Sequence, residues 1–455
     1  MSSIIQYLKG FLTAERKNVL KISYGTIMGQ LISMVTIPIM TRLYGAVIIG
    51  VWTILNSVAQ IGYSVSDLAL SNAIMIEDDE NKTQTIYQVI STVSLLVSVL
   101  TGFISFAYFA FTEFPEGIYP IFLVLYIMCA VFTLQQIQIC YTWLNRVGEY
   151  NVLMKNPILN NLTFAAFSIF LAILGMKRYG YFIGWLLGQA VTLLHMKRHL
   201  PKHMFTHSIE DFLYVVKKHR RFVQYQLPNN VVGTFKNQLP TLLIRSFFGT
   251  ETLGYYSITV KIMTVPVGFL ATAMGRVFFQ HTAELKRRGE PLGEYVYRSV
   301  SDTMKIGVIP LLVILGIGDV LTNWFLGNGW EMSGVFIRIM VVQNFFLFQM
   351  NTMMGISSVL EKQNYSLISS IAQCAGFAAG MSIGKYVFDN PHTAVALMSA
   401  TFVIIHCVYF SMLFRCVHIP VRRYLVFLVR NVGFIFLGAF LLRYVCVLLG
   451  FAISF

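Results

Sequence analysis

The sequence predicts an all-α polytopic membrane protein, with two six-helix bundles in parallel repeat around a central cavity and an extra C-terminal hydrophobic segment. Of the 455 residues, 56% are hydrophobic and 12% are charged, whereas about 25% of residues are charged in a soluble domain. Apolar runs long enough for a helical span, roughly 20 residues, recur along the chain. They lack the strict alternation of a membrane β-barrel. In addition, a segment of the first half recurs in the second half.

Charged residues and Gly or Pro clusters divide these runs into membrane spans. The first six spans are expected near 19–41, 47–76, 85–112, 119–144, 152–175 and 180–196. The second six are expected near 222–247, 254–280, 301–325, 333–360, 364–388 and 392–414. The last apolar stretch, 424–453, is one long helix or a short hairpin.

The spans predict a division of the chain into five parts. These are an interfacial amphipathic N-terminus (1–18), an N-terminal six-helix bundle (19–197), a basic cytoplasmic linker (198–221), a C-terminal six-helix bundle (222–415) and an extra C-terminal membrane segment (416–455). Ile4, Leu8 and Leu12 recur at helical spacing in the first part, a pattern typical of a helix that lies in the membrane surface.

The distribution of Lys and Arg predicts the orientation. Basic residues gather before the first span, between the sixth and seventh spans and after the eighth span, all on one side of the membrane. Because cytoplasmic loops carry the excess of Lys and Arg, we expect a cytoplasmic N-terminus. The net charge of +14 follows from this asymmetry and from contact with anionic lipid headgroups, so it does not indicate a nucleic-acid partner.

The internal repeat joins the first two spans of each half. Its residues follow nearly the same order and spacing in the two copies, namely Pro38, Arg42, Gly45, Gly50 and Trp52 against Pro240, Arg245, Gly249, Gly254 and Tyr256. Six spans return the chain to its starting side. The two halves therefore have the same orientation, as in transporters built from parallel repeats.

Polar side chains share one face of several spans, at about 100° per residue of a helix. The seventh span is the most polar, and the first two spans contribute further amides: the residues expected to contact a substrate are Gln226, Asn230, Lys236 and Asn237, with Gln30, Asn56 and Gln60. Such faces point away from lipid. They line a cavity between the halves, or they bond neighbouring helices together.

The charged residues within the spans are the other candidates for the site. Lys236 and Lys261 lie well inside their spans and are expected to bind an anion. Arg42, Arg245 and Arg276 lie near span ends, where they contact substrate or reach toward the membrane interface. Asp67 is a candidate for binding a coupling cation or proton, or it pairs with a neighbouring basic residue.

Other patterns do not indicate a site. His195, His199, His203 and His207 recur every four residues, but Pro201 interrupts the helix that a metal site on one face would need. The acidic run 77–80 is interpreted as a solvated loop. The sequence contains no phosphate-binding glycine loop and no hydrolase motif, and we expect no cofactor, no metal and no catalytic residue.

Three segments resemble the polysaccharide flippases of the multidrug/oligosaccharidyl-lipid/polysaccharide exporter superfamily. They are the eighth-span segment 248–284 with Lys261 and Pro266, the segment Pro38–Trp52, and the segment Trp143–Tyr150 after the fourth span. The resemblance covers nearly the whole chain.

The resemblance implies two six-helix bundles and alternating access. The implied substrate is an undecaprenyl-pyrophosphate-linked oligosaccharide, moved from the inner to the outer leaflet of the bacterial cytoplasmic membrane. Lys261 stands where the family commonly has a basic residue. The acidic Asp67 and the short segment after Arg423 depart from the peptidoglycan-precursor branch and favour the O-antigen or capsule type.

Two other functions fit a polytopic helical membrane protein less well than the flippase. A cation-coupled multidrug exporter has the same architecture, but its cavity would be acidic or aromatic rather than basic. A membrane polymerase or ligase would carry a large outer loop, whereas the long loops here are expected to be cytoplasmic. We expect a monomer embedded in the lipid bilayer, with a polysaccharide polymerase and a chain-length regulator as the partner proteins to test.

Overall fold

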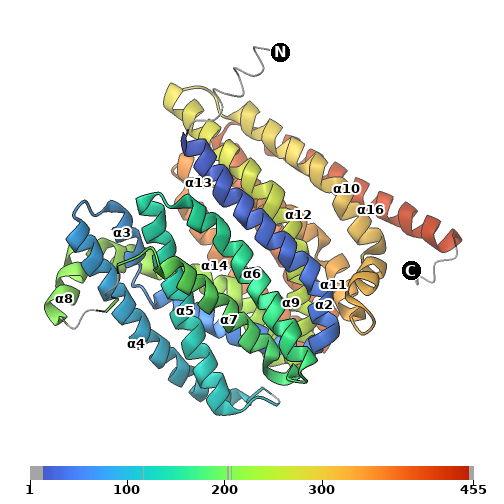
Figure 1. The fold of residues 1–455 in the computed structure, drawn as a ribbon. Coiled ribbons are helices and arrows are strands. Elements are labelled where there is room, and N and C mark those ends of the chain that lie inside the picture. The colour runs from blue at the N-terminus through green and yellow to red at the C-terminus, as the bar shows by residue number, and fades with distance from the viewer. Residues whose placement is uncertain (1–13, 116, 202–203, 206–207, 450–455) are drawn as a thin grey trace, which may run out of the picture. The chain divides into compact units, whose positions relative to one another are not determined.

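The computed structural model shows an all-helical chain and describes residues 14–115, 117–201, 204–205 and 208–449 (Figure 1). Residues 1–13 of the expected interfacial N-terminus lie outside the described residues. The chain forms two compact units, Met1–Gln238 and Leu239–Phe455, and each is described by itself.

Within the described residues, the first unit starts with one long helix that is bent at Gly45. The helices of this unit are α2 (Ala14–Val65), α3 (Ala73–Ile76), α4 (Glu80–Thr112), α5 (Pro120–Val147), α6 (Tyr150–Ile173), α7 (Lys177–Lys197) and α8 (Ile209–Lys218), with a 3-10 turn at Leu70–Asn72 and a π-helical turn at Phe222–Gln226. α9 (Leu227–Arg288) starts in the first unit and continues into the second.

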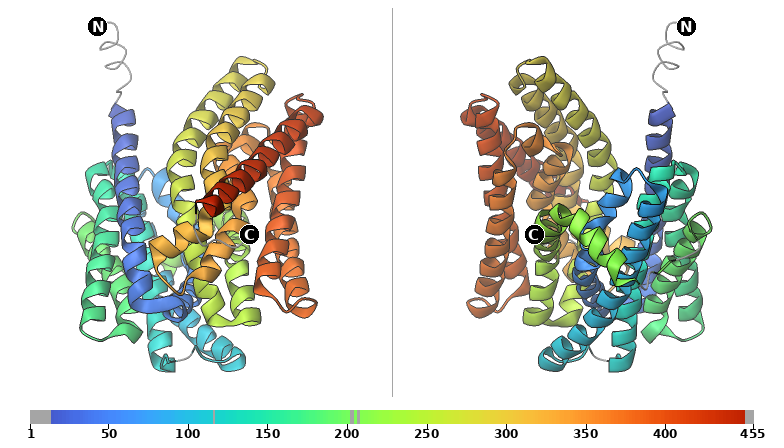
Figure 2. Two further views of the ribbon diagram at one scale, coloured as in Figure 1. Left: turned by 90° about the vertical axis from the view of Figure 1, so that its right-hand side faces the viewer. Right: turned by 90° about the vertical axis from the view of Figure 1, so that its left-hand side faces the viewer.

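The described part of the second unit contains the remaining part of α9 and seven further helices. These are α10 (Gly293–Leu326), α11 (Glu331–Ile339), α12 (Val341–Thr352), α13 (Ile356–Val359), α14 (Gln363–Tyr386), α15 (Pro391–Cys416) and α16 (Val421–Leu448). α14 and α15 run side by side, and α16 lies along α10 (Figure 2). α16 is a single helix, so the hairpin alternative for the last apolar stretch is wrong within the described residues.

Glycine residues allow helices to approach closely within the first unit. A Cβ added at Gly25 of α2 would lie 2.0 Å from the carbonyl oxygen of Met154, and one added at Gly184 of α7 would lie 2.1 Å from the Ser168 hydroxyl. Helix pairs in membranes pack through such small residues, because backbones that approach closely gain van der Waals contact. α6 therefore has a close contact on both sides, with α2 and with α7.

Eight helices of the described chain are long and apolar enough to cross a membrane, and the bent pair α11 and α12 is a ninth candidate. The sequence predicts more spans for two reasons. α2 carries the first two expected spans in one continuous candidate. The sixth, seventh and eighth expected spans lie on α7 and α9, which are helical but more polar than the other long helices.

Two of the expected spans are not continuous helices in the structure. The second span, expected to reach residue 76, ends as a helix at Val65 and continues as a turn, a 3-10 turn and α3. The tenth span, 333–360, consists of α11, α12 and α13, with a bend of 58° between α11 and α12. The arrangement of both sets of spans around a central cavity stays a prediction.

Candidate functional site

A polar pocket of about 420 Å³ lies inside the first unit. Turn residues after α2, two glutamines of α5 and the beginning of α9 form its wall. The lining residues are Tyr63, Ser64, Asp67, Ala69, Ser71, Asn72, Gln135, Gln138, Asn229, Asn230, Gly233, Thr234 and Asn237. Carboxamides and hydroxyls predominate in this lining, so the pocket offers hydrogen-bond donors and acceptors of low charge.

The turn that follows α2 is held by Asp67. Leu68 and Ala69 have φ angles of 50° and 57°, a left-handed conformation that costs about 1–2 kcal/mol for each residue that is not glycine. The Asp67 carboxylate accepts hydrogen bonds from the backbone N–H groups of Ala69 (2.8 Å) and Ser71 (3.3 Å). An aspartate that bonds to its own backbone in this way stabilises a turn. Asp67 therefore shapes the wall of the pocket.

Gln135 of α5 fixes both ends of this turn. Its side chain is only 1% exposed. Its Oε1 atom lies 2.9 Å from the Ser66 hydroxyl, and its Nε2 atom lies 3.4 Å from the Ser71 hydroxyl. A buried amide that lacks hydrogen-bond partners destabilises the folded state. This bridge therefore holds α5 against the turn.

The beginning of α9 is anchored to the same wall. A π-helical turn at Phe222–Gln226 precedes Pro228, which has no backbone N–H to donate to the preceding turn. Gln226 Nε2 donates to Asn230 Oδ1 (3.0 Å), and Gln238 Oε1 accepts a hydrogen bond from the Ser57 hydroxyl of α2 (2.7 Å). The polar face of the seventh span is thus partly a helix-to-helix contact and partly a pocket lining.

The structure brings together some of the predicted residues. Asp67, Asn230 and Asn237 line the pocket, and Gln226 bonds to Asn230. Gln30, Asn56 and Gln60 are half-buried side chains of α2, outside the lining. Asp67 was expected inside the second span, near 47–76, but α2 ends at Val65, so Asp67 lies in the turn that follows this helix.

The predicted basic residues are not members of the pocket lining. Lys236 is half-buried in the part of α9 that belongs to the first unit, and Lys261 is half-buried in the part that belongs to the second. Arg42 is exposed and Arg245 is half-buried. Arg276 lies on α9, and its side chain falls outside the described part of the structure. Their roles stay predictions.

Gln135 and Gln138 are two of the lining residues that the sequence reasoning missed. Both lie in the fourth expected span, within the stretch Gln135-Gln136-Ile137-Gln138. This cluster of amides inside an apolar run was a signal of buried polar contacts.

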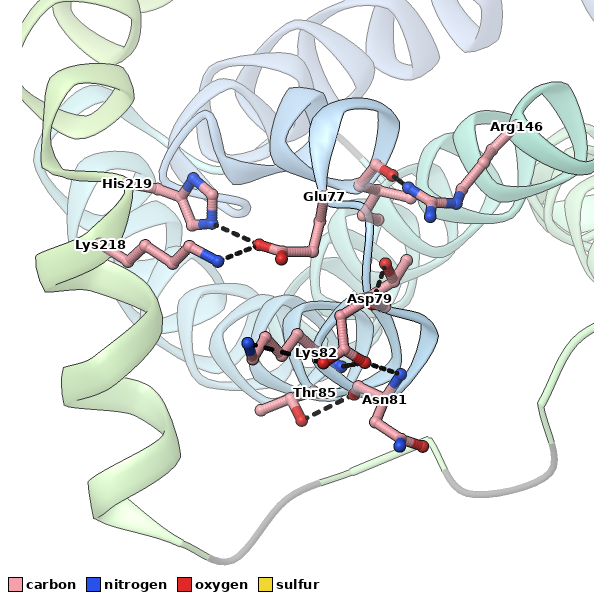
Figure 3. Close-up of polar contacts among 10 residues, drawn as sticks. Glu77, Asp79, Asn81, Lys82, Thr85, Arg146, Lys218 and His219 are labelled. Carbon is pink, nitrogen blue, oxygen red and sulfur yellow. Dashed lines mark hydrogen bonds and ion pairs between the residues drawn. The ribbon is translucent and has the colours of Figure 1, made fainter.

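A second polar cluster lies beside the first residues of α4, as Figure 3 shows. Glu77 is 8% exposed and forms an ion pair with Lys218 at the end of α8. His219 Nε2 lies 3.6 Å from the same carboxylate. Beside these contacts, Val215 of α8 is buried in an apolar cluster with Ile74 and other side chains. Apolar and ionic contacts together hold α8 against α3 and α4.

Contacts and burial shift the pKa values of this cluster. The hydrogen bond from Lys218 lowers the pKa of the Glu77 carboxyl from its ordinary value of 4.5, and the nearby charges of His219 and Lys82 act in the same direction. Burial lowers the pKa of His219 from its ordinary value of 6.5, and the Lys218 charge adds to this effect. Glu77 is therefore charged and His219 is neutral at pH 7.

The interpretation of the acidic run 77–80 as a solvated loop is wrong for Glu77, whereas Asp79 is exposed as expected. Glu77 is buried and paired. Asp79 is the N-cap of α4 and accepts hydrogen bonds from the backbone N–H groups of Asn81 (2.9 Å) and Lys82 (3.4 Å). Such a cap stabilises a helix by about 1 kcal/mol. Among the described residues, no group of three His, Cys, Asp or Glu side chains could hold a metal ion, and His203 and His207 lie outside the described residues.

Comparison with known proteins identifies the family. A family model described as "Polysaccharide biosynthesis protein" matches residues 39–335, which is well over half of the chain. The chain belongs to the polysaccharide biosynthesis protein family.

A curated relative and two solved structures are similar to this family member. The teichuronic acid biosynthesis protein TuaB of Bacillus subtilis is 22% identical over 297 residues, a match that covers 63% of this chain and 59% of the relative's length. The lipid II flippase MurJ in an inward closed conformation has a TM-score of 0.71 and 12% identity, with 93% of this chain and 97% of that chain covered.

An inward-facing multidrug resistance transporter, of the MATE family within the MOP superfamily, is also similar. Its TM-score is 0.58 at 14% identity, with 88% of this chain and 94% of that chain covered. The chain is thus a polytopic membrane protein of the polysaccharide biosynthesis protein family, and its fold is similar to those of MurJ and of this MATE transporter.

Proposed function

We propose that the protein is a flippase for lipid-linked oligosaccharides. It would move undecaprenyl-pyrophosphate-linked repeat units from the cytoplasmic to the outer leaflet of the bacterial inner membrane by alternating access, for O-antigen, capsule or another surface polysaccharide. Membership of the polysaccharide biosynthesis protein family and a fold shared with a lipid II flippase and a MATE transporter support this function.

The observation that carries the proposal is the chemistry of the polar pocket. Asn229, Asn230 and Asn237 from α9 and Gln138 from α5 line the same space of about 420 Å³. Sugars present many hydroxyl groups, and each of these both donates and accepts hydrogen bonds, as a carboxamide does. A pocket lined by amides and hydroxyls in a membrane protein therefore fits an oligosaccharide better than it fits an apolar drug.

The pyrophosphate requires cations, and we assign this task to the lysines of α9. Lys236 is adjacent in the chain to Asn237, which lines the pocket, and Lys261 is a half-buried lysine in the part of the same helix that follows Gly249. A lysine acts on phosphate as a point charge. In this proposal the two ammonium groups hold the diphosphate while the amides hold the first sugars. Arg42, Arg245 and Arg276 are secondary candidates for contact with the same group.

A cation-coupled multidrug exporter is the alternative within the same fold. Its cavity would hold organic cations through free carboxylates or aromatic faces. The carboxylate in the pocket, Asp67, already accepts two backbone hydrogen bonds in its turn. This engagement favours the flippase.

The proposal is tested by leaflet transfer in liposomes. Purified protein is reconstituted, and the transfer of a fluorescent undecaprenyl-pyrophosphate oligosaccharide between protected and exposed leaflets is measured. We expect transfer by the wild type and a loss of about tenfold or more when Asn230→Ala and Asn237→Ala are combined, since each removes hydrogen bonds of about 1 kcal/mol. Asn151→Ala, at an exposed asparagine on α6, is the matched control.

The result is decided by two comparisons. A folded double variant that transfers the lipid at the wild-type rate would remove the pocket from the proposal. A wild-type protein that transfers no lipid-linked oligosaccharide but exports organic cations would replace the flippase by the exporter.

A further inference from the structure

An ionic cluster in the second unit connects three helices. Asp319 of α10 accepts two hydrogen bonds from Arg443 of α16, at 3.2 and 3.0 Å, and Arg443 is only 6% exposed. Arg338 of α11 lies 3.4 Å from the same carboxylate. One carboxylate thus faces two guanidinium groups, and these three residues together carry one excess positive charge.

The backbone of α10 is adapted to this cluster. Ile317 has φ −133° and ψ 19°, outside the helical range. Beside it, the carbonyl oxygen of Leu315 accepts a hydrogen bond from Arg338 Nε (3.0 Å), and that of Gly316 accepts one from Arg443 Nη1 (2.9 Å). Carbonyls at an interruption of the helix are available to side-chain donors. The arginines are therefore held in fixed positions.

An apolar groove adjoins Arg338. Its volume is about 600 Å³, and its walls come from α10, α11, α12, α15 and α16. Most of the lining is aliphatic or aromatic, with Arg338 as the charged member. Ile404 and Phe436 at its edge are 62% and 51% exposed, and both belong to helices that are candidate membrane spans. In a bilayer, such exposed apolar residues face hydrocarbon chains.

We propose that this groove binds an anionic phospholipid. One acyl chain would lie along the aliphatic wall, and the phosphate would contact Arg338. Arginine matches phosphate because its planar group presents several N–H donors together. In the described part of the chain, the hydrogen bonds to Leu315 and Asp319 use two of the five donors of Arg338. The excess positive charge of the cluster selects an anionic headgroup over a zwitterionic one.

The proposal is independent of flippase activity, because binding is measured without any transfer. Purified protein is titrated with phosphatidylglycerol or phosphatidylcholine in detergent, and bound lipid is counted by native mass spectrometry. We expect one phosphatidylglycerol to be retained at concentrations where phosphatidylcholine is not. Arg338→Gln should weaken this binding about tenfold, since it removes a hydrogen bond between charged groups. Arg430→Gln, at an exposed arginine elsewhere on α16, should bind as the wild type does.

A second variant tests the groove without changing the ionic cluster. Ala400→Phe places a ring in the groove and should reduce the retention of phosphatidylglycerol, and this variant tests the proposal even if Arg338→Gln does not fold. Equal retention of the two lipids by the wild type would overturn the proposal, and so would unchanged binding in Ala400→Phe. Glycerol phosphate, which has no acyl chain, should not compete; full competition would show a plain anion site in place of a lipid site.

Discussion

Gly45 and Gly249 have the same backbone conformation, one that other residues rarely adopt. Gly45 has φ 72° and ψ 173° within α2, and Gly249 has φ 84° and ψ 178° within α9. This region of conformational space is essentially restricted to glycine. Each glycine breaks a long helix at the corresponding point of the repeated segment, so the repeat seen in the sequence encodes a specific bend in the chain.

The two glycines should be the least replaceable residues of the repeated segment. A Cβ added at either position meets no atom within 4 Å, so the cost of alanine is conformational and not steric. We expect Gly45→Ala and Gly249→Ala each to destabilise the protein by about 1–3 kcal/mol and to lower its melting temperature in detergent. Gly433→Ala is the matched control, because Gly433 also has open space around it but lies within α16 without a positive φ. Equal melting temperatures for all three variants would show that the bends carry no strain.

Asp67 should matter to the turn more than to ion coupling. Asp67→Ala removes the acceptor for two backbone N–H groups and leaves Leu68 and Ala69 in the left-handed region without support. A loss of about 1–2 kcal/mol is expected, as for the loss of a helix cap, whereas Asp67→Asn should keep most of the stability. Transfer under imposed proton and sodium gradients separates the roles: a stable Asp67→Asn variant that loses its response to one gradient would assign coupling to this carboxylate.

Gln135 and Gln138 should respond differently to alanine. Gln135 is buried and bridges Ser66 and Ser71, so Gln135→Ala is expected to cost about 1–3 kcal/mol of stability. Gln138 is half-buried at the pocket surface, so Gln138→Ala should change transfer with little effect on melting temperature. Transfer rate and melting temperature are measured for each variant. A Gln138→Ala variant that loses stability but keeps its transfer rate would show that Gln138 does not contact the substrate.

The docking of α8 should weaken as pH falls. The pKa values of His219 and Glu77 are both lowered in the folded chain, so undocking takes up protons and acid favours it. The contribution of His219 is present above its ordinary pKa of 6.5 and declines below it, and that of Glu77 declines below 4.5. Hydrogen exchange of the amides 209–218, corrected for intrinsic rates, should rise in these two windows.

Two variants separate the contributions to α8 docking. Glu77→Gln should raise exchange at neutral pH and remove the second window, and His219→Gln should remove the first. Exchange that does not depend on pH in the wild-type protein would show that the apolar contacts of Val215 hold α8 alone.

The sequence predicted the membrane-protein class and the repeated segment, but it did not predict where individual helices are interrupted. Composition and run length predicted a helical membrane protein, and the motif around Gly45 and Gly249 predicted equivalent positions in two halves. The end of α2 at Val65 was missed because Leu68, Ala69 and Leu70 are apolar residues that read as a continuing helix. A single carboxylate, Asp67, stabilises the turn that replaces it.

Contacts between distant segments were equally hidden. Glu77 was predicted to be solvated because its partner Lys218 is 141 positions away in the chain. Gln135 likewise finds Ser66 and Ser71 only after folding. The sequence located Asn230 and Asn237, since a polar face on one helix is visible from periodicity. The residues of α5 and of the turn after α2 that line the same pocket could not be predicted from the periodicity of one helix.

The most direct test of the central claim combines leaflet transfer with the lysines of α9. Transfer of labelled undecaprenyl-pyrophosphate oligosaccharide is measured in liposomes for the wild type, for Lys236→Ala with Lys261→Ala, and for both lysines changed to arginine, with folding checked for each. The account predicts transfer by the wild type, a loss of at least about tenfold in the alanine pair, and partial recovery with arginine. Transfer that is unchanged in a folded alanine pair, or absent from the wild type, would contradict it.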